Sequence, residues 1–319
     1  MLLRPLNRKS VIPQRHDAIP PELASALYTR SMELASSGLG GIRIARKLSE
    51  RYSLDVCPGT INHWIYGDHK PRLRNIFRVG PSKALSYIIG ANIGDGCTLA
   101  KSGLVKLEVT DMDFAQTFNT NMAELFSRKT PNKILARQFK SARLPLFIVK
   151  YSSRQLVSVL RLPEKKLLKL AFAFPREFLR GFFDAEGHVD VSASDSFRLC
   201  VGAENSDRIL LVRIKTILLA SFGIHSGINR KRRVGTRKTI RGESFQMKRT
   251  SFSLMVGRLD SVMKFADEIG FSILRKSQKL EDALTVFEKC GRRNGSTAWN
   301  ELYTKKRGEW VRHESPHRT

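Results

Sequence analysis

Two nine-residue stretches of the chain each place a carboxylate near the end of an apolar segment. The first, IIGANIGDG (88–96), has Asp95 in eighth place, and the second, LRGFFDAEG (179–187), has Glu186 there. Each has glycine in the third and ninth places and a small residue in the seventh. Two carboxylates that meet in space repel each other unless a cation lies between them, and hard oxygen ligands favour Mg²⁺. The residue types therefore predict a magnesium site, provided that the fold brings the two acids together.

The small residues supply a reason for the acids to meet. The third and seventh places of a helical nonapeptide lie four residues apart and share one face. They are Gly90 and Gly94 in the first stretch and Gly181 and Ala185 in the second. Small side chains let two helix backbones approach closely, so we expect the two segments to pack together as a helix interface. Their ends would then coincide.

The rest of the chain repeats around these two stretches. Residues 82–172 and 174–288 each read as helix, two strands, helix, two strands and helix, with apolar positions at helical or alternating spacing. The repetition predicts an internal duplication, with one nonapeptide heading each half.

The overall charge points to a polyanionic partner. Lys and Arg number 56 against 29 Asp and Glu, the net charge is +27 and the pI is about 10.4. Nucleic acid is the commonest polyanion inside a cell, although a charge-rich solvated surface is the alternative explanation. No apolar run is long enough to span a bilayer and no secretory signal is evident, so a cytoplasmic location is expected. The four cysteines lack ligand spacing, which indicates reduced thiols rather than disulfides or structural zinc.

Residues 1–75 follow a different pattern and end in a basic linker. Helices are predicted over 41–52 and 59–68, joined by a turn, which is typical of a helix-turn-helix DNA-binding domain. In that arrangement Asn62 and His63 would face the DNA. The alternative is a small helical bundle with no such role.

The two nonapeptides, each heading a similar half, resemble those of LAGLIDADG homing endonucleases of the single-chain, two-motif kind, over roughly residues 82–288. The resemblance implies an α+β fold in which two pseudo-symmetric αββαββα half-domains form a DNA-binding saddle, here preceded by a small all-α helix-turn-helix domain. It implies a monomer that binds double-stranded DNA and leaves a double-strand break with short 3′ overhangs. By the same resemblance Asp95 and Glu186 bind two or more Mg²⁺ ions, for which Mn²⁺ can substitute.

The family also tends to place a basic residue near each metal site. Lys150 falls at the matching place in the first half and is the expected third catalytic residue, with Lys106 a weaker candidate. The second half has Leu254 at the matching place, which departs from the pattern. We interpret Asp184 as structural rather than as a third ligand, and His188 as a phosphate or solvent contact rather than as a base.

Base and phosphate contacts are expected from two basic stretches, 229–249 and 128–143. The first is predicted to form a β-ribbon, the alternative being a disordered loop. The side chains expected to contact DNA are Arg230, Lys231, Arg232, Arg233, Arg237, Lys238, Arg241, Lys248, Arg137 and Lys140. Residues 289–319 are expected to form a basic C-terminal tail, either a further contact with DNA or RNA or simply a poorly ordered tail.

Three other functions compete with DNA cleavage. The termini lack the splicing residues of an intein, so a free-standing enzyme of an intron or mobile gene is expected. A regulator that binds DNA without cutting it and an RNA maturase are the remaining alternatives on the same fold. Both motif acids are present, which favours cleavage.

Overall fold

The computed structural model describes residues 21–52, 54–67, 75–139, 144–240, 243–306 and 309–313. These residues belong to two compact units, drawn from Met1–Arg78, Thr98–Val105 and Tyr151–Arg161 and from Val79–Cys97, Lys106–Lys150 and Leu162–Thr319. Lys140 and Arg241, two of the predicted DNA contacts, lie outside the described residues. Within the described ranges, none of the helices combines the length and the apolar character needed to cross a membrane.

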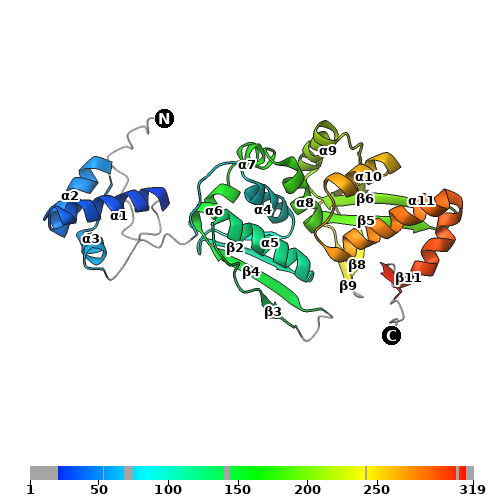
Figure 1. Cartoon of the computed structure of the whole chain (residues 1–319), viewed down its shortest axis with the longest axis horizontal. Helices are drawn as coiled ribbons and strands as arrows, with labels where there is room; N and C mark the ends of the chain where they lie inside the picture. The colour runs from blue at the N-terminus through cyan, green and yellow to red at the C-terminus, as the bar shows by residue number, and fades with distance from the viewer. Residues whose placement is uncertain are drawn as a thin grey trace. The chain divides into compact units, whose positions relative to one another are not determined.

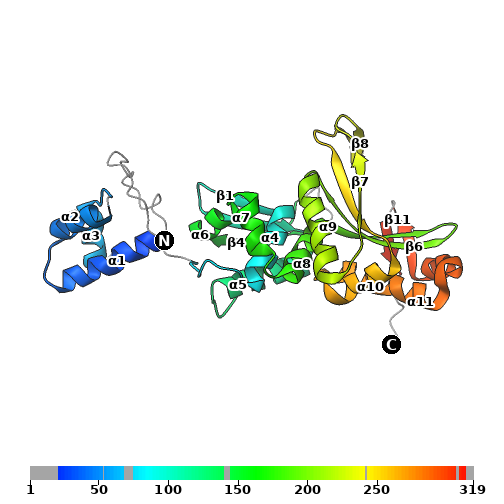
Figure 2. The ribbon, with the colours of Figure 1, turned by 90° about the horizontal axis from the view of Figure 1, so that it is seen from above.

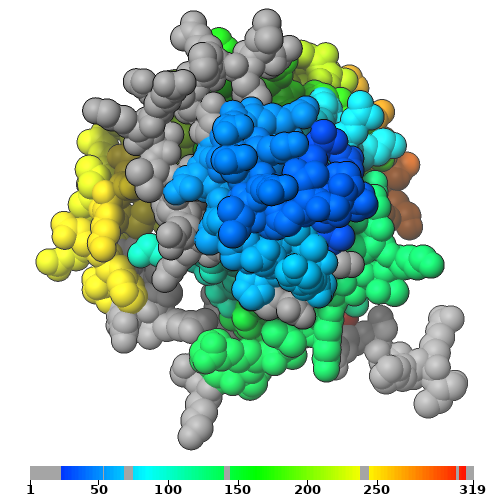
Figure 3. All heavy atoms as spheres, turned by 90° about the vertical axis from the view of Figure 1, so that its left-hand side faces the viewer, coloured from blue at the N-terminus to red at the C-terminus, as the bar shows by residue number. Residues whose placement is uncertain are grey.

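Three short helices form the N-terminal bundle, drawn in blue in Figure 3: α1 (Pro21–Ser36), α2 (Gly41–Tyr52) and α3 (Pro58–Ile65). The predicted inward positions of α2, Ile44, Ala45 and Leu48, are buried. They pack with apolar residues of α1, of α3 and of the turn before α3, including Trp64. The bundle therefore has a hydrophobic core of its own.

The segment that follows the bundle is fixed by hydrogen bonds to the start of α6 (Arg154–Leu160). The amide of Gln155 bonds both backbone groups of Phe77, accepting at 2.9 Å and donating at 3.0 Å. Ser153 Oγ donates to the carbonyl of Asn75 at 2.7 Å. The chain is thus held firmly just before α4 begins.

Two halves of the same element order follow (Figure 1). The first contains α4 (Lys83–Gly94), β1 (Gly96–Leu99), β2 (Leu104–Val109), α5 (Met112–Leu125), β3 (Leu135–Arg137), β4 (Leu146–Ser152) and α6. After α7 (Glu164–Ala171), the second contains α8 (Pro175–Glu186), β5 (Gly187–Ala193), β6 (Phe197–Asn205), α9 (Arg208–Phe222), β7 (Gly227–Arg232), β10 (Ser251–Val256) and α10 (Leu259–Glu268). The sheet orders, β1-β2-β4-β3 and β5-β6-β10-β7, correspond strand by strand. The predicted α+β fold with two αββαββα halves is confirmed.

Alternation along the strands explains how each sheet presents one face to its helices. In β6 the side chains of Phe197, Leu199 and Val201 are buried, whereas Arg198 between them is exposed. This period of two leaves the opposite face of the sheet open, as is usual for antiparallel sheets. At the next helix Asp207 accepts bonds from two backbone amides at 2.9 and 3.1 Å and so caps α9.

The two halves meet where α4 packs against α8, and the contact is between backbones. A Cβ atom added at Gly90 would lie 2.2 Å from the carbonyl oxygen of Phe178. One added at Gly181 would lie 2.3 Å from the carbonyl oxygen of Tyr87. Only glycine fits at these two crossing points. Residues 84–91 of α4 are all buried, so this helix lies at the centre of the molecule's larger unit.

The basic stretch of the second half forms a β-ribbon that extends beyond the sheet, as Figure 2 shows for β7 and β8. β8 (Arg237–Ile240) and β9 (Glu243–Gln246) follow β7 and precede β10 along the chain, and they pair with each other antiparallel. The turn that precedes β8 uses Gly235 at φ 85°, and its amide donates to the carbonyl of Met247 at 2.8 Å.

The C-terminal stretch is folded rather than a tail. α11 (Leu274–Leu302) runs through the predicted boundary at residue 288, with a kink at Gly291, and is followed by β11 (Tyr303–Lys306) and β12 (Glu309–Arg312). Trp299 is fully buried and stacks on Tyr303 with 4.0 Å between ring centroids. Trp310 donates to the carbonyl of Val191 in β5 at 2.8 Å. The C-terminal stretch is thus attached to the second sheet through Trp310.

We predict that Gly181→Ala lowers the free energy of unfolding by about 2–3 kcal/mol, because the added methyl group must push two helix backbones apart. Chemical denaturation measures the change. Gly227→Ala is the matched control, since a Cβ atom there meets nothing within 4 Å. A loss at Gly181 no larger than at Gly227 would contradict the close backbone contact.

Candidate metal centre

Asp95 and Glu186 lie at the adjoining ends of the two packed helices. Asp95 is the C-cap of α4, and Glu186 is the last residue of α8. A Cβ atom added at Gly94 would lie 2.4 Å from Cβ of Ala185 and 3.0 Å from Cγ of Glu186. The side chain of Glu186 therefore rests directly against the residue that precedes Asp95. The four small residues of the two nonapeptides all line this contact.

The two carboxyl groups disfavour each other's charge. Burial, followed by the negative charge of Asp95, raises the pKa of Glu186 to about 7. A hydrogen bond from Asn205 Nδ2 to Glu186 Oε1, at 3.3 Å, partly offsets the rise. Burial likewise raises the pKa of Asp95. A cation placed between them would relieve both effects.

The donor set fits a hard divalent ion that also binds a substrate. Among the described residues, no group of three or more His, Cys, Asp or Glu side chains is placed to hold a metal. Mg²⁺ commonly takes only one or two carboxylates from a protein and completes its shell with water and phosphate oxygens. Asp95 and Glu186 match that pattern, because two carboxylates converge without further protein ligands of these types.

Asp184 is structural, as its place in the nonapeptide indicates. Its side chain is 1% exposed and accepts three hydrogen bonds, from Tyr87 Oη at 2.8 Å and from Ser272 N and Oγ at 2.8 and 2.5 Å. These bonds join α4, α8 and the segment before α11. Both oxygens of the carboxylate accept hydrogen bonds from protein donors, which gives Asp184 a structural role.

Lys150 and Leu254, which occupy matching places in the two halves, lie in different environments. Lys150 is exposed on β4, and the register of β3 with β4 places it on the same face as Arg137. Leu254 is fully buried in β10, on the face that its neighbour Ala203 of β6 shares. The sheet therefore leaves the second half with no counterpart of Lys150 at that position.

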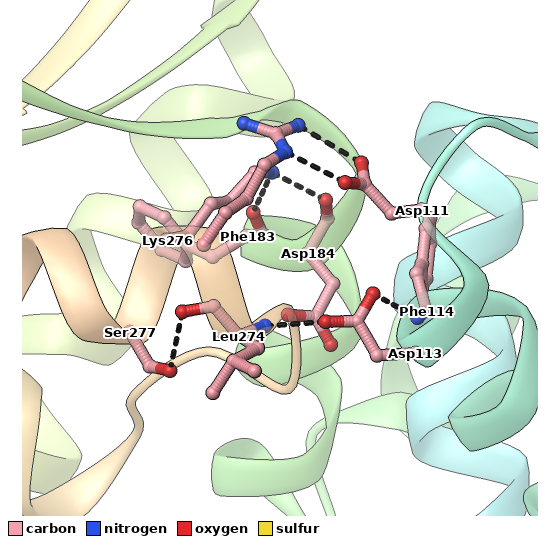
Figure 4. Close-up of polar contacts among 9 residues, drawn as sticks. Asp111, Asp113, Phe114, Phe183, Asp184, Leu274, Lys276 and Ser277 are labelled. Carbon is pink, nitrogen blue, oxygen red and sulfur yellow. Dashed lines mark hydrogen bonds and ion pairs between the residues drawn. The ribbon is translucent and has the colours of Figure 1, made fainter. Parts of the chain in front are cut away.

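The cation that acts on both acids is Lys276, which the sequence analysis missed. Lys276 is only 7% exposed, and its Nζ donates to the carbonyls of Asp184 at 2.6 Å and Phe183 at 3.3 Å (Figure 4). Its charge lowers the pKa of both Asp95 and Glu186, which opposes the effect of burial. Burial, then the neighbouring Arg275, lowers the pKa of Lys276 itself to about 8.

His188 lies on the open face of the second sheet, beside the site. Its ring is close to Gly202, where an added Cβ atom would come 2.7 Å from Nε2. Burial, then the charge of Lys231, lowers the pKa of His188. The lowered pKa favours the neutral form of the imidazole. In the first half, Lys106 forms an ion pair with Glu108 at 2.9 Å.

Most of the predicted DNA-contacting side chains are gathered on the ribbon of the second half. Arg230, Lys231, Arg232 and Arg233 occupy β7 and its end, Arg237 and Lys238 begin β8, and Lys248 follows β9. Lys231 is paired with Glu204 of β6, so one ribbon cation is neutralised by the sheet. Arg137 stacks over the ring of Phe139, 4.5 Å from its centroid.

Asn62 and His63, the two residues of the N-terminal bundle that are predicted to face DNA, differ in their exposure. His63 is exposed on α3, as expected. Asn62 is half-buried, and a Cβ atom added at Gly41 would come 1.9 Å from its Oδ1. Asn62 therefore packs between α3 and the start of α2 rather than pointing outward, because the close approach of the two helices leaves its side chain no other space.

Comparison with known proteins assigns the chain to a family. The LAGLIDADG-like domain matches residues 173–270. An uncharacterized protein of Methanocaldococcus jannaschii, MJ0398, is 30% identical over 252 residues, which cover 77% of this chain and 89% of that protein. The chain belongs to the LAGLIDADG family.

Similar solved structures include two kinds of protein. The homing endonuclease I-DmoI, in complex with DNA and Mn, is 18% identical, with a TM-score of 0.39 over 59% of this chain and 96% of that one. The full-length DUF199/WhiA protein from Thermatoga maritima is 18% identical, with a TM-score of 0.42 over 71% of this chain and 68% of that one.

We predict that the metal-free protein loses stability as the pH rises from about 4.5 to 7. Over this range the folded state keeps a proton on Glu186, whose pKa is about 7, while the unfolded chain releases it near the ordinary value of 4.5. The folded state then binds more protons than the unfolded state, so the free energy of unfolding falls with pH. The raised pKa of Asp95 acts in the same direction.

Chemical denaturation in a chelator, repeated across this pH range, measures the slope. Glu186→Gln should remove most of it, whereas Glu268→Gln on the surface of α10 should leave it unchanged. An equal slope in the Glu186→Gln variant would show that the acid pair is not under electrostatic strain.

Proposed function

We propose that this protein is a site-specific endonuclease that hydrolyses one phosphodiester bond on each strand of double-stranded DNA. The observation that carries the proposal is the convergence of Asp95 and Glu186 at the ends of two helices whose backbones touch. The net charge of +27 supports a polyanionic substrate. A relative of the same fold, I-DmoI, is described as a homing endonuclease bound to DNA and Mn.

Each residue of the centre has a definable task in that reaction. Asp95 and Glu186 would hold Mg²⁺, which when bound activates water and stabilises the charge that develops on phosphate oxygens. Asn205 holds one oxygen of Glu186 and so fixes the direction of its other oxygen. Asp184 anchors the end of α8 through Tyr87 and Ser272. The backbone contact at Gly90 and Gly181 keeps the two acids in register.

Recognition of the DNA is assigned to the open faces of the two sheets and to the ribbon. Arg230 of β7 and Arg237 of β8 are exposed and close in sequence to the sheet, a placement suited to guanine edges and phosphates. The ribbon has no counterpart of the same length among the described residues of the first half, where β3 is Leu135–Arg137. The two half-sites of the target would then be read over different lengths.

We assign DNA binding as well to the N-terminal bundle, in which α2, a turn and α3 form a helix-turn-helix arrangement. Arg43, Arg46 and Lys47 are exposed on α2, and His63 is exposed on α3. In this arrangement the second helix enters the major groove and the first crosses the phosphate backbone. The bundle would lengthen the footprint or bind the DNA that controls the protein's own expression.

The chief alternative is a protein that binds DNA, or RNA as a maturase, without cutting. The energetics of the site favour cleavage. Glu186 is half-buried beside Asp95, and its pKa, raised to about 7, means that its charge costs stability in a protein that never binds a cation there. An amide at either position would remove that cost without disturbing the helix contact. The presence of both acids is therefore explained by metal binding.

Cleavage is the direct test of the proposal. Purified protein incubated with a randomised plasmid library and Mg²⁺ should produce breaks at one long sequence with short 3′ overhangs. Asp95→Asn and Glu186→Gln should each slow cleavage on the order of 10³-fold, since each removes a charge that holds a metal worth several kcal/mol to the transition state.

Asp267→Asn, which removes an exposed carboxylate of α10, is the control and should cut at the wild-type rate. Sequencing of the ends gives both rate and target. Retention of one DNA sequence without any metal-dependent break, alike in all four proteins, would establish the non-cleaving alternative.

The ribbon generates a separate prediction. Replacing both Arg233 and Arg237 by alanine should weaken binding to the selected site and reduce the slope of log affinity against log salt by about 2, because each arginine releases about one counterion. Fluorescence anisotropy over a range of salt concentrations measures the slope. Lys215→Ala, an exposed change on α9, should leave it unchanged. Equal slopes in the two variants would place the DNA elsewhere.

A further inference from the structure

The first turn of α11 connects parts of the molecule that are far apart in sequence. Three consecutive residues, Leu274, Arg275 and Lys276, contact both α5 of the first half and the end of α8 (Figure 4). No sequence pattern of the nonapeptides or of the half-domains accounts for this turn.

Leu274 and Arg275 fix this turn to the start of α5. The guanidinium of Arg275 bonds both carboxylate oxygens of Asp111, at 2.6 and 2.9 Å. The backbone amide of Leu274 donates to Asp113. Asp111 holds the same place before α5 that Asp207 holds before α9, yet only Asp207 caps its helix. The carboxylate of Asp111 has been diverted from capping to bind Arg275.

This anchoring directs Lys276 to the C-terminal end of α8. Its ammonium group donates to the carbonyl of Asp184, two residues before Glu186, and to that of Phe183. The last carbonyls of a helix lack intrahelical donors and carry partial negative charge, so a buried ammonium there is well placed. The ring of Phe271 lies 5.7 Å from Nζ and closes off one side.

We propose that Lys276 is a built-in counter-ion of the acid pair, holding Asp95 and Glu186 together in the metal-free protein and fixing the end of α8. It is a positioning residue, because its bonds are to the backbone of α8 and not to the reacting atoms. The proposal rests on the acid pair as the proposed metal site, but the counter-ion role itself requires only that the two carboxylates be charged.

A single lysine then serves both acids, which accounts for the absence of a basic residue at Leu254. The pairing also differs from a simple helix cap. A cap would stabilise the protein whatever stood at positions 95 and 186, whereas a counter-ion stabilises it only when carboxylates stand there. Double-mutant cycles separate these two contributions.

The test is thermal unfolding in a chelator at about pH 7.5. Lys276→Met should lower the melting temperature on the order of 5–10 °C in the wild-type background. In the Asp95→Asn/Glu186→Gln background the same change should cost less than half as much. Lys276→Gln, which keeps a donor for the Asp184 carbonyl but no charge, should show the same rescue and serves if the methionine variant does not fold.

Lys279→Met is the matched control. Lys279 lies on the same helix, is half-buried, and donates to the carbonyl of Val189 at 2.9 Å, but the charges that act on it are those of Asp190, Glu309 and Arg275 rather than of the acid pair. Its cost should be the same in both backgrounds. An undiminished cost of both Lys276 variants in the amide background would overturn the proposal and leave Lys276 as a helix cap.

A second measurement keeps this result distinct from the proposed function. Calorimetric titration of the wild-type protein and of the Asp95→Asn/Glu186→Gln variant with Mn²⁺ reports whether the acids bind metal. Binding that depends on the acids, and is tighter by several-fold in Lys276→Gln because a competing positive charge is gone, supports both. If the wild-type protein does not bind Mn²⁺ through these acids, the nuclease proposal fails, while the melting cycle still decides the role of Lys276.

Discussion

The backbone contact between α4 and α8 is the constraint on which the rest of the structure depends. Gly90 and Gly181 allow the two helices to touch along their main chains, and no larger residue fits at either point. This close contact sets the distance between α4 and α8 and brings their C-terminal ends together. It therefore determines where Asp95 and Glu186 lie. The same contact pairs the two duplicated halves.

The electrostatic interaction between the two acids opposes the packing that brings them together. Packing forces two carboxylates into one partly buried place, and burial together with mutual repulsion raises the pKa of Glu186 to about 7. A protein with 27 excess positive charges uses few of them here: among the described residues, the buried ammonium of Lys276 is the one whose charge acts on Asp95, Asp184 and Glu186 alike. Several exposed cations lie instead on the ribbon, among them Arg230, Arg233 and Arg237, where they face solvent and can meet phosphate.

The sequence was sufficient to predict the fold and the packing of the two nonapeptide helices, because both follow from local patterns. Glycine at the third place of each nonapeptide, and alternation in strands such as β6, are periodic signals that a single chain displays. Lys276 was missed because it lies in a stretch whose charges read as the exposed face of an amphipathic helix, and only tertiary contact shows that it turns inward. The folded C-terminal stretch was missed for a related reason: Trp299 packs against Phe197 of β6, which is far away in the sequence. Asn62 faces inward because two helices approach more closely than their spacing in the sequence indicates.

The central claim is that the acids at the α4–α8 junction hold a divalent ion on DNA. Anomalous scattering from Mn²⁺, in crystals of the protein bound to its selected DNA site, tests it most directly. The account predicts Mn²⁺ peaks within bonding distance of both Asp95 and Glu186 and of the phosphate oxygens opposite them. Peaks confined to other sites, with both carboxylates bound only to protein or water, would contradict it.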